Sequence, residues 1–429
     1  MPDSQPQGPD EGRTGTDHDG ATLLLSGARL ADGRTVDVRI TDGHIQAVGT
    51  AGSLADTVPR DRGTRVDLTG YLLLPAPAEP HAHHDNALTA DASGPPSQDP
   101  GDVQRRTTQA ALLQLGHGAT AIRTHVRVGD VTGLGPLQAV LGARRALRGL
   151  TELSVVAVPG LLTGMAGADG LALLRDAVRM GVDVVGGCPD LDPDPAGHTE
   201  AVLELAAEHG RPVDLHTGAP EPVRLARLAT MAGGLRPRVT IGPCRGLARL
   251  PQDVARQLAE RLAASGVGVV TLPQGGCAYE GGSGPSGQPG NPGPGKAGWA
   301  PLRLLRAAGV HVAAGSGALR DTANPVGRGD PLEAAFLLAS AAEADPDTAY
   351  AAVSAAARHT LGLPPVRVEA GFPAELLAVR GQTVSGVLSL GYSRVVVHRG
   401  RVVARTSAVR EFCDAADANG LDLPRQAQG

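Results

Sequence analysis

The chain has 429 residues, which is enough to bury a large core, and its formal net charge is −5. Only 2% of its residues are aromatic, and Lys296 is the single lysine among 39 basic residues. This composition excludes the stacking surfaces and the basic patch on which nucleic-acid binding depends.

The cysteines and the hydropathy pattern indicate the compartment. The 4 cysteines lie far apart and form no C-x-x-C pair, which is typical of a reducing cytoplasm rather than of a disulfide framework or a zinc ribbon. No stretch reaches the roughly 18 apolar residues that a membrane span requires, and the N-terminus lacks the features of a signal peptide. We therefore expect a soluble, cytoplasmic protein without a membrane partner.

Both ends of the chain have strand patterns. Residues 1–20 lack hydrophobic periodicity and are expected to be a disordered tail. Short apolar runs separated by Asp-Gly turns then predict a β domain over residues 21–70. Residues 366–410 return to this pattern and are expected to complete the same domain, followed by a C-terminal tail over 411–429.

Residues 71–365 repeat a different unit, in which a short apolar strand is followed by a loop and a helix rich in Ala, Leu and Arg. This pattern predicts a (β/α)8 TIM-type barrel, inserted in a small β-sandwich domain that the N- and C-terminal segments form. A doubly wound parallel sheet is the alternative. The expected barrel strands are Tyr71–Leu74, Thr120–Thr124, Ser154–Val158, Val182–Val185, Pro212–His216, Arg238–Ile241, Gly266–Leu272 and Val310–Ala314.

Three histidines form a candidate metal site. In the run Glu79-Pro-His-Ala-His, the side chains of His81 and His83 project to the same face of an extended backbone and can reach one ion. His216 ends the fifth expected strand and is the candidate third ligand. Three neutral imidazoles leave a coordination position for water, as in catalytic rather than structural zinc sites.

These motifs, with Ile122-Arg-Thr-His-Val, Val213-Asp-Leu-His and Asn324-Pro-Val-Gly, resemble those of the amidohydrolase superfamily, most closely its cytosine deaminase branch. The similarity extends over about residues 21–407. The resemblance implies a barrel with one divalent metal ion, Zn or Fe, that hydrolyses a C–N bond of a cyclic amidine or amide. It also implies a small-molecule ligand and is compatible with a homo-oligomer. Lys296, in a glycine-rich stretch, argues against the dinuclear subclass that uses a carbamylated lysine.

The catalytic positions that the resemblance implies are largely replaced. Ala219 stands in place of the proton-shuttling glutamate, Pro243 in place of a histidine, and Gly317 in place of the aspartate that is both metal ligand and base. Substrate-recognition positions are changed as well, to Gly160 and Ala323. Glu221 and Asp85 remain as candidate catalytic carboxylates. Because several acid–base groups are missing together, we expect that the chain does not deaminate cytosine.

Other polar residues have structural interpretations. His125 is expected to be a hydrogen-bonded structural histidine, and Cys188 an inert buried cysteine that could also approach the metal. The segment Asp190–Asp194 lacks the residues of a calcium loop and is expected to be a solvated loop.

Three functions therefore remain open from the sequence. The chain is a metal-dependent hydrolase with a changed substrate, a non-catalytic ligand-binding or assembly protein that keeps the barrel, or a binding barrel without a metal.

Overall fold

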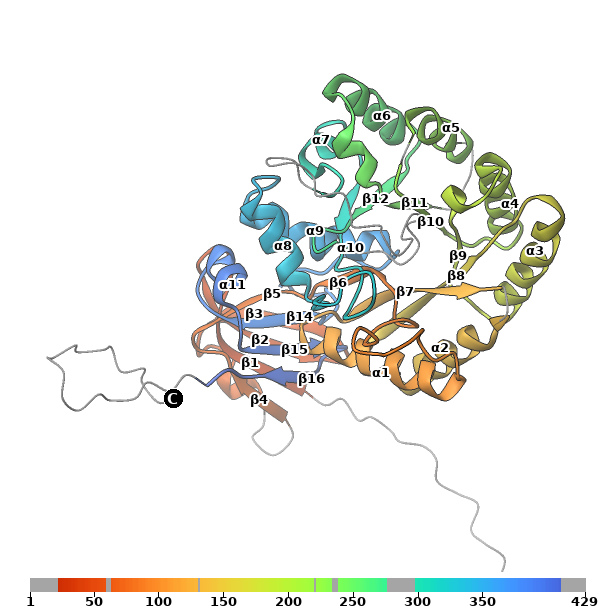
Figure 1. Cartoon of the computed structure of the whole chain (residues 1–429). Helices are drawn as coiled ribbons and strands as arrows, with labels where there is room; N and C mark the ends of the chain where they lie inside the picture. Colours follow the sequence, from red (N-terminus) through yellow and green to blue (C-terminus); the bar gives the residue numbers. More distant parts are fainter. Residues whose placement is uncertain are drawn as a thin grey trace, which may run out of the picture.

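The computed structural model describes residues 22–58, 63–129, 132–219, 221–233, 238–275 and 298–409. The expected tails, residues 1–20 and 411–429, and Lys296 lie outside these ranges. A barrel surrounded by helices lies beside a second sheet, to which both ends of the described chain contribute (Figure 1).

The barrel consists of eight parallel strands that neighbour one another in chain order, from β6 to β13. It closes where the N–H of Gly317 donates to the carbonyl of His81 over 3.1 Å, next to a bridge between Ala82 and Gly317. The strands are β6 (Ala78–Ala82), β7 (Ala121–Val128), β8 (Glu152–Pro159), β9 (Val184–Gly187), β10 (Val213–Thr217), β11 (Val239–Pro243), β12 (Gly268–Thr271) and β13 (Val312–Ala314).

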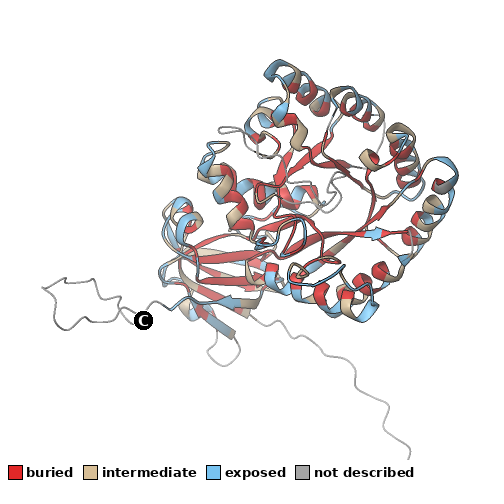
Figure 2. Ribbon diagram, viewed as in Figure 1, coloured by how far each residue is buried: buried red, intermediate tan, exposed pale blue. Residues whose placement is uncertain are grey.

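Helices cover the outside of the barrel, and their buried faces point toward the strands (Figure 2). They are α1 (Pro100–Gly116), α2 (Gly135–Ala146), α3 (Gly164–Arg179), α4 (Pro195–Glu208), α5 (Pro222–Ala232), α6 (Gln252–Ala264), α7 (Leu302–Ala307), α8 (Pro331–Ser340), α9 (Pro346–Val353) and α10 (Ala355–Thr360). Short 3₁₀ helices span Ala55–Thr57, Pro189–Leu191 and Arg245–Arg249.

An Asp-Pro pair begins four of these helices, α1, α4, α8 and α9. In each, the aspartate side chain accepts a hydrogen bond from a backbone N–H of the first turn, and the proline stands at a position where no N–H is needed. The sequence therefore fixes where these helices begin, and so the orientation of the loops that precede them.

The second sheet has the order β16-β15-β14-β5-β1-β2-β3, with β4 paired to β1. One face of this sheet has an apolar core of its own, and the other face, with Leu72, Leu377 and Val396, packs into the apolar cluster of the barrel. Its strands are β1 (Thr22–Arg29), β2 (Thr35–Thr41), β3 (His44–Thr50), β4 (Gly63–Asp67), β5 (Tyr71–Pro75), β14 (Leu376–Arg380), β15 (Arg394–His398) and β16 (Arg401–Thr406), and helix α11 spans Val384–Leu390. The expected barrel inserted in a β-sandwich domain is confirmed, and the doubly wound alternative is not found.

One expected strand was assigned to the wrong sheet. The segment Tyr71–Leu74 is part of β5, which pairs with β14 and β1 in the second sheet, and the first barrel strand is β6. A short apolar run does not reveal which sheet it joins. The true first strand, Ala-Glu-Pro-His-Ala, contains a proline and two polar residues and does not read as a strand.

The described residues contain no helix that is long and apolar enough to cross a membrane.

Asp330 links the barrel to the second sheet. Its carboxylate caps α8 by accepting from the N–H of Leu332 at 2.9 Å and also binds both terminal nitrogens of Arg394, at 2.8 and 2.7 Å. Arg394 donates to the carbonyl of His117 as well, at 2.7 Å. The largest effect on the pKa of Asp330 is burial, which raises it, but the Arg394 guanidinium outweighs burial and holds this pKa below its usual range.

We predict that Asp330→Ala lowers the free energy of unfolding by about 3 kcal/mol, because it removes a helix cap and leaves a nearly buried guanidinium without its partner. Denaturant-induced unfolding followed by circular dichroism measures the loss. Asp345→Ala is the matched control, because Asp345 caps α9 without an ion pair and its loss should be clearly smaller. Equal losses in the two variants would contradict the role given to the ion pair.

Candidate metal centre

Four buried histidines meet at the C-terminal ends of three barrel strands. His81 lies in β6 and His83 directly follows it, His125 lies in β7, and His216 lies in β10. Each offers one nitrogen to a group in which all four atoms lie within 4.8 Å of one another. The structure thus brings together the three histidines expected from the sequence and adds His125.

The three expected ligands meet through their Nε2 atoms. Nε2 of His83 lies 3.2 Å from Nε2 of His81 and 3.3 Å from Nε2 of His216. Two imidazole nitrogens that bind one zinc ion at 2.0–2.1 Å in tetrahedral geometry lie about 3.4 Å apart. The observed spacing is therefore that of ligands around a single ion.

The electrostatic environment keeps these rings neutral. Burial, and next the neighbouring His125 ring, lower the pKa values of His81, His83 and His216 well below the usual range. Only a neutral imidazole has a lone pair for a metal. The residues present therefore fit a divalent ion such as Zn²⁺ or Fe²⁺, in both spacing and protonation.

His125 has two contacts that define its role. Its Nδ1 lies 3.3 Å from the carbonyl oxygen of Ala82, and its Nε2 lies 3.3 Å from Oδ1 of Asp214. The expectation of a hydrogen-bonded histidine holds for Nδ1, but the ring also belongs to the metal-ligand group. The sequence signal was available, since His125 directly follows the expected strand Thr120–Thr124, which pairs with the strand that carries His81.

A buried ion pair lies beside this group. Asp214, two residues before His216, accepts from Nη1 of Arg123 at 2.8 Å, and Arg123 also donates to the carbonyl of Thr360 at 3.0 Å. Burial would raise the pKa of Asp214, but His125 and then Arg123 outweigh it and lower this pKa to about 2. The site therefore contains a buried ion pair next to the imidazoles.

The two candidate catalytic carboxylates are placed differently. Glu221 is exposed, pairs with Arg224 at 3.0 Å, and lines a groove of about 190 Å³ between α4 and α5. Asp85 is buried, its Oδ2 accepts from the N–H of Arg127 at 3.4 Å, and burial raises its pKa to about 6. Among the residues that the structure describes, no carboxylate belongs to the four-histidine group.

The residues at the replaced positions have backbone roles, and their side chains cannot act as acids, bases or metal ligands. Gly317 donates its N–H to His81, Pro243 ends β11, and Ala219 is buried at a φ of 53°. Asp321, the next acidic residue after Gly317, accepts from the backbone N–H groups of Ala323 and Asn324, at 2.8 and 3.0 Å, and shapes a turn.

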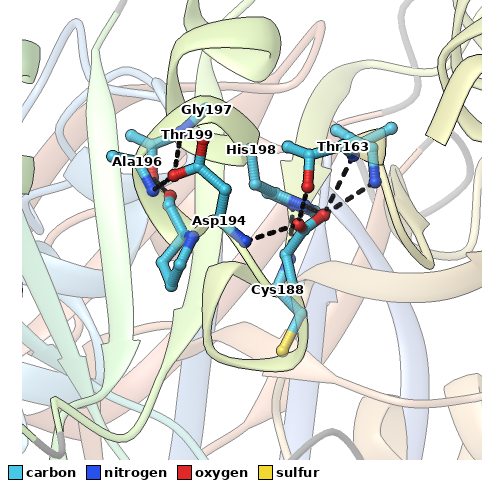
Figure 3. A network of polar contacts seen from close by, with 10 residues as sticks. Thr163, Cys188, Asp194, Ala196, Gly197, His198 and Thr199 are labelled. Atoms are coloured by element: carbon cyan, nitrogen blue, oxygen red, sulfur yellow. Dashed lines mark hydrogen bonds and ion pairs between the residues drawn. The ribbon is translucent and has the colours of Figure 1, made fainter. Parts of the chain in front are cut away.

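A second polar network lies at the end of β9 (Figure 3). Nδ1 of His198 lies 3.0 Å from Oδ2 of Asp192, and Nε2 of His198 accepts from the backbone N–H of Cys188 at 3.2 Å. Asp192 also accepts from the backbone N–H groups of Leu162 and Thr163. The expectation of a solvated loop was therefore wrong for Asp192, which is only 5% exposed and holds neighbouring barrel loops together. Cys188 is buried, as expected.

Known proteins with similar sequences and structures share this architecture. No family model matches the chain. Pterin deaminase of Rhizobium rhizogenes is 27% identical over 401 residues, which cover 86% of this chain and 88% of that protein. The structure of N-isopropylammelide isopropylaminohydrolase from Burkholderia multivorans is 26% identical with a TM-score of 0.75, and covers 90% of this chain and 99% of that one.

These similarities are to members of the amidohydrolase superfamily and are consistent with the expected cytosine deaminase-like branch. The fold of 5-methylcytosine deaminase from Klebsiella pneumoniae agrees, with a TM-score of 0.76 over 92% of this chain and 100% of that one, at 22% identity. The names of these relatives specify deaminases and amidohydrolases, and the buried histidine group is where this chain could hold a metal ion.

We predict that Asp214→Asn lowers the free energy of unfolding by about 3 kcal/mol, because it leaves the buried Arg123 without its counter-charge. The pKa of Asp214 is about 2 in the folded chain, below the roughly 3.9 of an unfolded aspartate. The wild-type pair therefore stabilises the fold above about pH 4, and this stabilisation is lost as the pH falls toward 2.

Unfolding of wild type and variant between pH 2 and 7 measures both effects, and the stability difference should shrink at the acidic end. Asp91→Asn is the control, since the ion pair between Asp91 and Arg320 is exposed and should contribute little. A difference that did not change with pH would contradict the assigned charge state of Asp214.

Proposed function

We propose that this chain binds one divalent metal ion through His81, His83 and His216 and hydrolyses a C–N bond of a small cyclic amide or amidine other than cytosine. The observation that carries the proposal is the convergence of three buried Nε2 atoms at 3.2 and 3.3 Å. A bound divalent ion would supply an activated water at neutral pH, and the barrel supplies a buried position for it.

The loss of cytosine deamination is part of the proposal. Deamination requires proton delivery to the ring and to the leaving amine, and each general acid or base typically contributes 10²- to 10⁴-fold. Ala219, Pro243 and Gly317 have no side-chain group that transfers a proton. Asp85 supports the hydrolysis of a substrate other than cytosine. It is a buried carboxyl group with a pKa of about 6, and it follows His83 by two residues in the chain.

The names of the relatives support a class of substrates for this chain but do not identify one substrate. Their names specify a pterin and N-isopropylammelide, which both carry C–N bonds on nitrogen-rich rings. We extend this class to the present chain as part of the proposal. Assembly into a homo-oligomer and a cytoplasmic location stay predictions.

A second function has one observation in its favour. Within the described part of the chain, the histidine group has no carboxylate member that could serve as base for the water. A non-catalytic protein that retains the barrel and the metal for ligand binding or assembly would have this arrangement.

The test measures metal content and turnover separately. Purified full-length protein should contain about one Zn or Fe per chain by elemental analysis. It should release ammonia or amine from at least one of a pterin, N-isopropylammelide or a hydantoin, with no detectable turnover of cytosine. His81→Ala should lose both metal and turnover, whereas His209→Ala, at a partly exposed site at the end of α4, should retain both.

The other outcomes decide between the remaining functions. Stoichiometric metal without turnover of the whole panel would contradict hydrolysis and support the non-catalytic function. Protein without metal, even after incubation with Zn²⁺ or Fe²⁺, would contradict both and leave a binding barrel without a metal.

A further inference from the structure

The position where the resemblance places an aspartate ligand has no side chain. Gly317 has a φ of 73°, a conformation that favours glycine, and its N–H is already bonded to the carbonyl of His81. The preceding residue, Ser316, donates its hydroxyl to Glu79, away from the imidazoles. The end of β13 therefore contributes no ligand, and an ion held by three histidines would lack a fourth protein ligand.

His125 lies where a fourth ligand is needed. Its ring centre is 4.2 Å from that of His81 and 4.4 Å from that of His216. One of its nitrogens lies within 4.8 Å of the ligand atoms of the other three histidines. Two nitrogens on one tetrahedral ion lie about 3.4 Å apart, so a ring shift of at most about 1.4 Å completes the set.

The hydrogen bond of His125 uses Nδ1 and leaves Nε2 available to bind a metal ion. A carbonyl oxygen can only accept, so the contact with Ala82 requires that Nδ1 carries the proton. In a neutral ring, Nε2 then has the lone pair. This arrangement, in which the second ring nitrogen donates to a backbone carbonyl, is the usual one for a metal-ligating histidine.

The surroundings of Nε2 of His125 favour a positive ion close to this atom. This atom and Oδ1 of Asp214 lie 3.3 Å apart, and both are buried and make no hydrogen bond to any described residue. The other oxygen of this carboxyl group, Oδ2, accepts from Nη1 of Arg123 at 2.8 Å. A lone pair and a carboxylate oxygen at this distance repel each other unless a positive ion lies close to both.

We propose that His125 is the fourth protein ligand of the metal site of this chain, that a further position stays open for water, and that Asp214 is the nearest balancing charge. The proposal rests on the metal site of the proposed function and adds its fourth member. A set of four imidazoles suits Zn²⁺, Ni²⁺, Cu²⁺ or Co²⁺ better than the hard, oxygen-preferring Mg²⁺ and Ca²⁺.

The test titrates Co²⁺ and Zn²⁺ into chelator-treated, full-length protein and follows the visible spectrum of Co²⁺ and the affinity for Zn²⁺. Replacement of partners that only orient a metal ligand costs 10- to 100-fold in affinity, so loss of a true ligand in His125→Ala should cost more than about 100-fold. The Co²⁺ spectrum of this variant should change as well. His209→Ala should match the wild type.

A third variant distinguishes direct coordination of the ion by residue 125 from a supporting role. Its readout is a new spectroscopic band rather than a loss of affinity. In His125→Cys, a sulfur at this position should give a thiolate-to-Co²⁺ charge-transfer band in the near ultraviolet, which arises only if the residue binds the ion. In His125→Gln, an amide replaces the imidazole, and the affinity should stay low. Recovery of affinity with Gln would show that His125 only supports its neighbours and would overturn the proposal.

The remaining outcomes distinguish this inference from the proposed function. If wild type binds the ion, and His125→Ala has the same affinity and Co²⁺ spectrum, the fourth ligand is wrong while the three-histidine site stands. If wild type binds neither ion, the metal site itself fails and the inference fails with it. Turnover plays no part in the result.

Discussion

The hydrogen bond between the N–H of Gly317 and the carbonyl of His81 closes the barrel at the level of the imidazoles. It joins the chain after β13 to β6, the strand that carries His81. His81 and His83 lie here beside His125 of the neighbouring strand β7 and close to His216 of β10. The same backbone position must adopt a positive φ, which disfavours an aspartate there. Glycine at this position therefore suits the backbone conformation that closes the barrel.

The polar residues inside the barrel are buried at a cost that their hydrogen bonds must offset. Glu79 accepts from the N–H groups of His81 and Ser316, at 3.0 and 2.9 Å, and the chain of contacts continues through Gln114 to His84. A Cβ atom at Gly315 would lie 2.5 Å from Oε1 of Glu79, so only glycine fits there. Small residues next to the site make room for this network.

Much of the fold could be predicted from the sequence, since seven barrel strands and the split second sheet follow from apolar runs and Asp-Gly turns. The remaining strand, β6, could not, because its Glu, Pro and His residues hide its strand character. The convergence of His81, His83 and His216 follows from strand ends that meet at one face of a barrel. The place of Asp192 and the second contact of His125 depend on loop packing and side-chain direction, which the local sequence does not encode.

The second sheet imposes an order on biosynthesis. Leu72 in β5 pairs with Val379 in β14, so about 300 residues separate the two partners of one ladder. A ribosome releases β5 long before β14 exists, and during that interval one edge of β5 has open hydrogen-bonding groups. The whole barrel sequence is synthesised before strands β14, β15 and β16. The second sheet can therefore be completed only after the barrel residues have left the ribosome. Truncation near the C-terminus would therefore affect a strand at the opposite end of the chain.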